Sequence, residues 1–327
     1  MDTFILMLRN VLVFLLLAVP GYILVKTKLL KESDTPPLSK ILVNVGMPAL
    51  IFANTISMDI RGGQAINLTL TALITFIFIL VFNFATIPVT NRFGDKNAIP
   101  NENGIKERPK CVTAQYSAVF ANTGFLGLPL AKAVFGASPV IDYMVVINVV
   151  GCIMLNTLGV YTFTGDKNKI SLKNILLNPT VLAFIVGLAV NISKICTYVP
   201  EISLFANHVS GLVTPISMMI VGIKLASVDL VKIFTSTKMY IVSVLKLIIQ
   251  PVVIVAVLLL ARLFIDVPTA IILGFFTALS MPTAGTATTF ADNFGGDVDG
   301  AVIYTLGTTI LSAISISFLY FAVMLLV

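Results

Sequence analysis

Ten long apolar runs divide this chain into segments of membrane length joined by short polar connections. Each run holds about 20 residues, which is the length that an α-helix needs to cross the hydrocarbon core of a bilayer. Charged residues make up only 11% of the 327 residues, against about 25% in ordinary soluble domains. The sequence therefore predicts an all-α integral membrane protein with ten transmembrane helices. The runs cover residues 4–25, 38–57, 65–90, 111–135, 139–163, 172–193, 202–226, 238–264, 268–292 and 299–326.

Basic residues gather in the odd-numbered connections between these runs. Because cytoplasmic connections carry an excess of Lys and Arg, the odd connections are predicted to lie inside and both termini outside. The same bias accounts for the net charge of +6, so we expect no nucleic-acid partner. We predict a multi-pass protein of the plasma (inner) membrane. The basic residues in question are Lys26, Lys28, Lys31, Lys40, Arg92, Lys96, Lys106, Arg108, Lys110, Lys167, Lys169, Lys173, Lys224, Lys232 and Lys238.

The polar stretch 164–171 divides the ten runs into five and five. An odd number of crossings in each half forces the halves into opposite orientations, so any repeat must be inverted. Asn44-Val-Gly-Met-Pro48 in the second run has a counterpart in Gly211-Leu-Val-Thr-Pro215 in the seventh. We therefore predict a first five-helix repeat over 1–163, a short cytoplasmic linker over 164–171 and a second repeat over 172–327.

The fourth and ninth runs are each interrupted by helix-breaking residues, at the same position in their halves. The first break reads Asn122-Thr-Gly-Phe-Leu-Gly-Leu-Pro129, and the second reads Ser280-Met-Pro-Thr-Ala-Gly-Thr-Ala-Thr-Thr289. Inside a bilayer, backbone that leaves the helix survives only where it is buried in protein or lines a cavity. A matched pair of breaks, one in each half, is typical of the binding site of a transporter.

Both breaks offer groups that suit a small anion. Unwound backbone offers carbonyls to a cation, and the N-termini of half-helices offer N–H groups and a partial positive charge to an anion. Amide and hydroxyl side chains add donors and acceptors, although the hydroxyls of the second break either satisfy freed carbonyls or face the substrate. We predict substrate contacts from Asn122, Thr123, Gly124, Pro129, Pro282, Thr283 and Gly285.

Four more polar residues in the runs are candidates for an ion, proton or charge role. An ammonium in the middle of a span costs about 2.5–3.5 kcal/mol on insertion scales, so Lys246 should face the protein interior. It either binds an anionic substrate, replaces a coupling cation or snorkels to the interface. Asp292 either binds a proton or sodium ion or caps a helix. Asn148 and Asn156 lie on one helix face, where they either join helices or line the site.

The sequence carries no pattern for catalysis or for a metal site. One histidine and no His-Glu-x-x-His pair leave little for a metalloenzyme or a Ser–His dyad. Cys111, Cys152 and Cys196 are isolated and form neither a disulfide framework nor a metal-binding spacing. A Walker-type phosphate loop is also missing from the sequence. We therefore predict no enzyme activity, no cofactor and no ATP-driven transport by this chain alone.

An ordered set of motifs resembles the auxin efflux carrier (AEC) family, and the resemblance spans essentially the whole chain. The motifs are Gly-Met-Pro48, Asn122-Thr-Gly…Gly-Leu-Pro129, Lys246…Pro251 and Met281-Pro-Thr-Ala…Phe290-Ala-Asp…Gly-Gly-Asp297. The resemblance implies two inverted five-helix repeats with a scaffold domain and a transport domain. It also implies that the broken fourth and ninth helices cross near the bilayer centre.

The resemblance further implies which residues meet the substrate. Asn122 would contact it beside the crossing of Pro129 and Pro282, and Asn44 and Pro48 would lie on the facing second span. Bacterial proteins of the family that resemble this chain export or import organic acids such as malate and malonate, and plant members carry auxin.

The predicted function is that of a secondary active carrier, which moves small organic anions by alternating access around the crossing. Malate-like or malonate-like carboxylates and an auxin-like acid are the predicted substrates. The alternatives are a sodium-coupled symporter of the bile-acid type, a channel and a non-transporting sensor. Proton, sodium and uncoupled modes stay open, as does a homodimer in the lipid bilayer. Neither break contains a carboxylate, which favours the absence of a sodium site.

Overall fold

Helices make up the regular secondary structure of the residues that the computed structural model describes, 2–93 and 110–327. Lys96, Lys106 and Arg108 of the third connection lie outside the described residues. The helices are α1 (Asp2–Lys26), α2 (Thr35–Ile41), α3 (Met47–Thr55), α4 (Gly62–Thr90), α5 (Lys110–Val119), α6 (Leu128–Phe135), α7 (Pro139–Met154), α8 (Val160–Thr164), α9 (Leu172–Leu176), α10 (Pro179–Ser193), α11 (Glu201–Ser210), α12 (Val213–Ser227), α13 (Leu230–Thr235), α14 (Thr237–Val244), α15 (Gln250–Arg262), α16 (Thr269–Leu279), α17 (Ala287–Phe294) and α18 (Val298–Met324).

Seven helical segments of the described chain are long and apolar enough to cross a membrane. They coincide with the first, second, third, fifth, seventh, eighth and tenth predicted runs, so the prediction of an all-α membrane protein is confirmed. The segments are Met7–Lys26, Glu32–Thr55, Gly62–Phe93, Pro139–Thr164, Glu201–Ser227, Thr237–Arg262 and Val298–Met324.

The other three predicted runs form shorter apolar helices. In the fourth run, α5 ends at Val119 and a new helical segment starts at Thr123. In the ninth, α16 ends at Leu279 and α17 starts at Ala287. The sixth run contains the 15-residue helix α10, with the short α9 before it. The two predicted breaks therefore interrupt real helices, while the total of ten crossings stays a prediction.

A π-helical turn stands directly before each of Pro48, Pro129 and Pro251. Proline has no N–H, and its ring clashes with the carbonyl four residues earlier, so the helix widens by one residue to pass it. The residue before each proline accordingly donates to a carbonyl five residues back: Met47 to Leu42, Leu128 to Thr123 and Gln250 to Leu245. The turns are η2 (Leu42–Gly46), η4 (Thr123–Gly127) and η8 (Leu245–Ile249).

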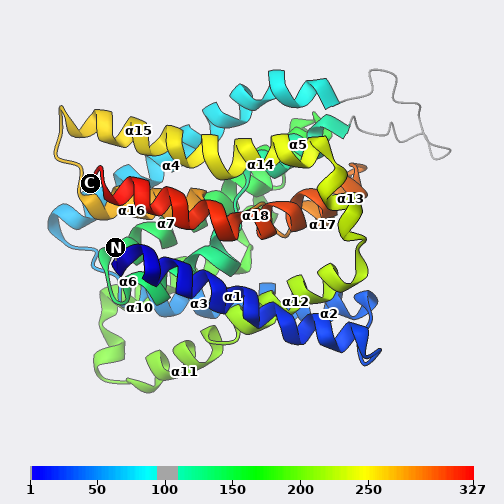
Figure 1. Cartoon of the computed structure of the whole chain (residues 1–327). Coiled ribbons are helices and arrows are strands. Elements are labelled where there is room, and N and C mark those ends of the chain that lie inside the picture. The colour runs from blue at the N-terminus through cyan, green and yellow to red at the C-terminus, as the bar shows by residue number, and fades with distance from the viewer. Residues whose placement is uncertain (1, 94–109) are drawn as a thin grey trace.

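The helices form two groups, which Figure 1 shows one above the other. In the lower group α1 packs on α12, and α3 packs on α10 and α11. In the upper group α4 packs on α5 and α7, α7 packs on α16, and α18 packs on α14 and α17. Both chain ends lie at the left end of the bundle in Figure 1, and α13 lies at the right end.

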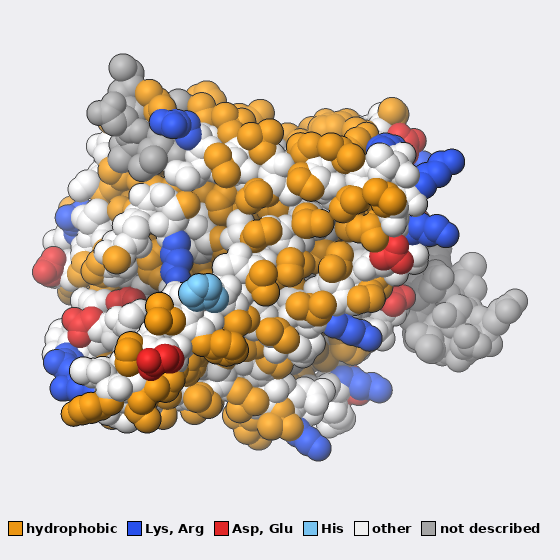
Figure 2. Space-filling model, turned by 90° about the horizontal axis from the view of Figure 1, so that it is seen from below, with side chains coloured by type: hydrophobic (Ala, Val, Ile, Leu, Met, Phe, Trp, Pro, Cys, Tyr) orange, Lys and Arg blue, Asp and Glu red, His pale blue; other side chains and the backbone are white. Residues whose placement is uncertain are grey.

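The surface between the two ends of the bundle is apolar. Figure 2 shows hydrophobic side chains spread across the middle of the lower face, with charged side chains gathered toward the ends. Such a belt matches a protein whose middle is surrounded by lipid chains instead of water. Large side chains exposed on this group of helices include Leu16, Ile185, Val186, Leu204 and Phe205.

Glycine allows α1 and α12 to touch backbone to backbone. A Cβ atom on Gly222 would overlap the carbonyl oxygen of Ala18, and one on Gly21 would overlap the carbonyl oxygen of Met219. Small residues of this kind are what membrane helices use to approach each other closely. The contact holds the lower group of helices together.

We predict that Gly222→Ala lowers the melting temperature of the purified protein. The added methyl group forces α1 and α12 apart, and overpacking of this kind costs about 1–3 kcal/mol, or roughly 2–4 °C for each kcal/mol. Gly63→Ala is the matched control, because a Cβ atom there meets nothing within 4 Å. Equal melting temperatures for the two variants in a thermal-unfolding assay would contradict the tight α1–α12 contact.

Candidate functional site

The two interrupted segments meet inside the protein and bond to each other through their backbones. The Asn122 N–H donates to the Pro282 carbonyl at 2.8 Å, and the Ala284 N–H donates to the Phe120 carbonyl at 2.9 Å. Ala121 and Thr283 form the antiparallel bridge between these two bonds. Backbone N–H and C=O groups that lose their helical partners in one break are therefore hydrogen-bonded to the other break. This paired region is called the crossing below.

Two threonine hydroxyls tie the crossing together in a reciprocal pattern. Thr123 of the fourth run donates to the Ala278 carbonyl of the ninth at 3.2 Å. Thr283 of the ninth run donates to the Ser117 carbonyl of the fourth at 2.8 Å. The Thr283 N–H also donates to the Thr308 hydroxyl at 3.1 Å. In this conformation both hydroxyls satisfy backbone carbonyls of the opposite run, which for Thr283 is one of the two alternatives predicted for the second break.

Four ends of half-helices converge at the crossing, with opposite partial charges. Helices α5 and α16 end there, at Val119 and Leu279. The segments η4–α6 and α17 begin there, at Thr123 and Ala287. The last carbonyls of a helix carry a partial negative charge and its first N–H groups a partial positive charge. The crossing thus offers carbonyl groups and N–H groups within one small region.

Lys246 and Gln250 donate hydrogen bonds to the C-termini of α16 and α5 at the crossing. Lys246 is fully buried, and its Nζ donates to the Leu279 carbonyl at 3.3 Å and to Oε1 of Gln250. Nε2 of Gln250 donates to the Val119 carbonyl at 2.8 Å. The placement rules out snorkelling of Lys246 in this conformation. The sequence analysis did not name Gln250 as a candidate site residue. Its position, a mid-span amide four residues after Lys246 and so on the same helix face, was a signal that could have identified it.

A small cavity of about 60 Å³ adjoins the crossing. Thr123, Ala121 and Asn148 line it, and Oδ1 of Asn148 is buried with no hydrogen-bond partner among the described residues. Buried polar atoms are normally satisfied, so this oxygen marks a place where a water or part of a ligand fits. A Cβ atom on Gly124 would overlap the Met47 side chain and crowd the Asn148 amide. Glycine at position 124 therefore allows the backbone of η4 to pack directly against the side chains of Met47 and Asn148.

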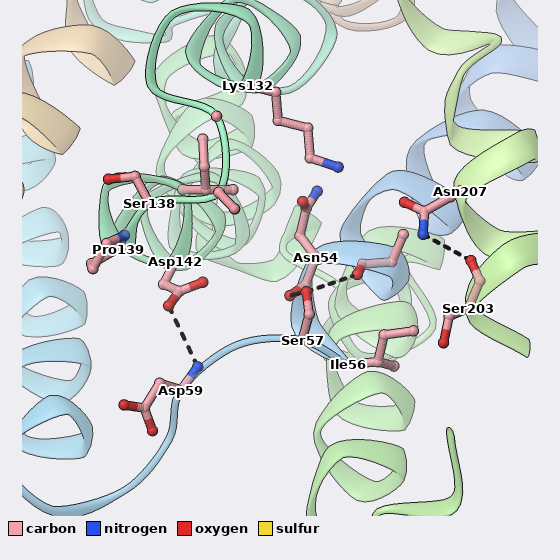
Figure 3. Close-up of a pocket in the computed structure, with 14 residues that line it drawn as sticks. Asn54, Ile56, Ser57, Asp59, Lys132, Ser138, Pro139, Asp142, Ser203 and Asn207 are labelled. Carbon is pink, nitrogen blue, oxygen red and sulfur yellow. Dashed lines mark hydrogen bonds between the residues drawn. The ribbon is translucent and has the colours of Figure 1, made fainter. Parts of the chain in front are cut away.

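A larger polar cavity of about 590 Å³ lies between the two groups of helices, toward the end that holds both termini. Figure 3 shows the side chains of Lys132 from α6 and Asn54 from α3 reaching into it. Asp142 accepts a hydrogen bond from the Asp59 N–H at 3.4 Å at its rim. We name this cavity the vestibule; Ser57, Ser203 and Asn207 also line it.

Some predicted site residues lie at the crossing and others do not. Asn122 is half-buried, Pro129 and Pro282 are buried, and Gly285 is half-buried beside open space. Asn122, Pro282 and Thr283 belong to the crossing itself, Thr123, Gly124 and Gly285 follow it directly in the chain, and Pro129 lies farther along, in α6.

Asn44 and Pro48 lie on a different face of the second span. They line an apolar groove with residues of α10 and α11, and the Asn44 amide donates to the Lys40 carbonyl at 2.9 Å. Met47, which stands between Asn44 and Pro48 in the sequence, is the residue that packs against Gly124. The structure therefore does not bring Asn44 and Pro48 to the crossing.

Asn156 and Asp292 are not among the residues that line the small cavity at the crossing. The Asn156 amide donates to the Cys152 carbonyl of its own helix at 2.8 Å. Asp292 is exposed on α17, and the residue that caps the next helix is Asp297, which accepts from the Gly300 N–H at 3.0 Å. Within the described part of the chain, no group of three or more His, Cys, Asp or Glu side chains could hold a metal ion.

Comparisons with known proteins identify the class to which this arrangement belongs. A family model described as membrane transport protein matches residues 6–172, just over half of the chain. The chain is also similar to an uncharacterized transporter of Methanothermobacter thermautotrophicus, with 25% identity over 219 residues, which cover 66% of this chain and 67% of that protein. The family and this relative are transporters and not enzymes. The chain belongs to the auxin efflux carrier-type family of membrane transport proteins.

Proposed function

We propose that this protein is a secondary active carrier that moves small organic anions across the plasma (inner) membrane by alternating access. The observation that carries the proposal is the crossing, where two broken helices meet beside the buried ammonium of Lys246. N-termini of half-helices pointing at an anionic group are the way in which carriers with broken helices hold such substrates. Malate-like or malonate-like carboxylates and an auxin-like acid fit these donors.

The proposed substrate contacts come from the start of the half-helix η4–α6 and from the second break. Asn122 is half-buried and makes no capping bond to η4, so its amide is available to a carboxylate. Asn148, whose Oδ1 has no hydrogen-bond partner among the described residues, lines the small cavity beside the crossing. Gly124, Thr123, Pro129, Pro282, Thr283 and Gly285 shape the backbone around the substrate. Contacts from Asn44 and Pro48 would need a conformation different from the one described.

The proposed architecture is two inverted five-helix repeats, over 1–163 and 172–327. The reciprocal bonds of Thr123 and Thr283 support it, because each break makes the same kind of contact with the other. Both termini lie at one end of the bundle, as an even number of crossings requires. The lower group of helices corresponds to the scaffold and the upper group, with the crossing, to the transport domain.

The vestibule is the proposed access route from the outside. It lies where α3 and α11 of the scaffold face α6 and α7 of the transport domain. Met47 packs against Gly124, next to the crossing, and we propose that this contact closes the route between the vestibule and the crossing. A shift of the transport domain along the scaffold would open it, as in other carriers built from repeats.

We predict that Asn122→Ala lowers organic-anion transport sharply while folding stays near that of the wild type. Loss of a hydrogen bond to a charged group is worth about 1.5–3 kcal/mol, or roughly 10-fold to 100-fold in substrate affinity. The measurement is uptake of radiolabelled malate and malonate into proteoliposomes, with Asn168→Ala, in an exposed loop, as the control. A normal substrate affinity of Asn122→Ala would contradict the proposed substrate contact of Asn122. If the wild type gave only background flux with a wide panel of organic acids, the proposed carrier function would be contradicted.

We predict that the vestibule is reached from outside the cell. In a variant without Cys111, Cys152 and Cys196, Ser57→Cys at the vestibule should react with a membrane-impermeant maleimide on intact cells. Asn168→Cys, in the linker between the repeats, should react only after the membrane is permeabilised. Both positions are exposed, so a difference in labelling reports the side of the membrane. The opposite pattern would contradict the predicted orientation.

A further inference from the structure

The vestibule contains an ammonium group that forms no ion pair with the carboxylates of the same cavity. Lys132 lies half-buried in the last turn of α6, and its side chain reaches into the vestibule. Its Nζ makes neither a hydrogen bond nor an ion pair within the described ranges. A charge that is partly removed from water normally has a partner of opposite charge or hydrogen bonds. An anion that entered the vestibule would therefore meet a cation without having to break an existing contact.

The carboxylate of the vestibule has contacts of its own. Asp142 accepts from the Asp59 N–H at 3.4 Å. It also lies in the first turn of α7, where the partial positive charge of the helix N-terminus favours an anion. Figure 3 shows Asp142 and Asp59 at one side of the cavity and Lys132 at another. The negative and positive groups of the vestibule are therefore kept apart, and the region around Lys132 stays suited to an anion.

An amide of the lower group of helices lies beside this ammonium. Asn54 of α3 is only 4% exposed, and Figure 3 shows its amide directed toward Lys132. Nδ2 of Asn54 donates one N–H to the Leu50 carbonyl at 2.6 Å, and its second N–H has no such bond. An ammonium and an amide N–H next to each other are a donor pair for the two oxygens of one carboxylate.

Helix α11 offers polar groups on the side of the vestibule away from Asp142. Nδ2 of Asn207 donates to the Ser203 carbonyl at 2.9 Å, which leaves its second N–H and the Ser203 hydroxyl for a ligand. These groups suit a hydroxyl or a second carboxylate at the other end of a small molecule. The cavity volume of about 590 Å³ lies within the range of about 300–1,000 Å³ that is usual for ligand sites.

We infer that the vestibule is a second anion site, which binds a small carboxylate between Lys132 of α6 and the side chains of Asn54 and Asn207. It is distinct from the crossing, because Lys132 lies at the opposite end of the half-helix η4–α6 from Thr123. A ligand that contacts both groups of helices favours the arrangement in which it can reach them all. The choice of a carboxylate rests on the proposed function, whereas the presence of an anion site does not.

The site is tested by thermal unfolding of the purified full-length Asn122→Ala variant, in which the proposed contact at the crossing is removed. Its melting temperature should rise with millimolar potassium malonate and not with potassium chloride of equal ionic strength, because a ligand of the folded state stabilises it. Addition of Lys132→Gln should raise the malonate concentration needed for the same effect about 10-fold or more. Addition of Lys194→Gln, at an exposed position outside the vestibule, should leave it unchanged.

Two outcomes of this measurement would overturn the inference. One is an equal effect of malonate and chloride on Asn122→Ala. The other is the same malonate dependence after Lys132→Gln as after Lys194→Gln, which would show that malonate acts elsewhere on the protein.

The contact with α11 is tested separately, with variants that keep Lys132. In the same background, Asn207→Ala should weaken malonate binding about 2-fold to 10-fold, the usual effect of losing one neutral hydrogen bond. His208→Ala is the matched control, because His208 follows directly on α11 and does not line the vestibule. Equal malonate binding by these two variants would overturn the bridging of the two groups of helices, even if Lys132→Gln could not be obtained folded.

Organic-anion flux of the wild type in proteoliposomes separates this inference from the proposed function. If flux occurs and malonate fails to stabilise Asn122→Ala, the vestibule site is overturned and the carrier function stands. If malonate stabilises this variant through Lys132 and no organic acid is transported, the carrier function is contradicted and the anion site stands.

Discussion

The structure depends on one constraint, which is that backbone taken out of a helix within a bilayer must find its hydrogen bonds inside the protein. The chain leaves the helix twice in this way, before Thr123 and after Leu279. Each break satisfies the other through the Asn122–Pro282 and Phe120–Ala284 bonds. Since neither break could exist alone at membrane depth, the upper group of helices has to be assembled around their meeting point.

The electrostatics of the crossing follow from the same arrangement. The two helix C-termini carry partial negative charge, and the ammonium of Lys246 and the amide of Gln250 donate hydrogen bonds to their carbonyls. Two half-helix starts bring partial positive charge, which stays available to an anion. The cost of burying a lysine is thereby offset by contacts that a mid-span apolar residue could not make. The arrangement separates the group that stabilises the fold from the groups that suit a substrate.

The division into two groups of helices relates the crossing to movement. Glycine contacts hold α1 close against α12 in the lower group, whereas residues of α3, α11, α6 and α7 line the polar vestibule. In the proposed carrier, the lower group would be the scaffold and the upper group would slide along it. Met47 against Gly124 and the hydrogen bond from the Ser217 hydroxyl to the Phe125 carbonyl join the two groups of helices next to the crossing.

The sequence by itself determined the class of the fold and the positions of the two breaks, because these depend on the length of the apolar runs and on the helix-breaking residues within them. It also determined the family, through motifs spread along the chain. Only the tertiary structure decided which side chains share a place. The resemblance implied that Asn44 and Pro48 face the crossing, but both line a groove with α10 and α11, while Met47 packs against Gly124. Likewise, Lys246 was recognisable as an interior lysine, yet its partners Leu279 and Gln250 were not. Helical periodicity defines the faces of each helix, whereas the packing of all the helices decides which face meets which.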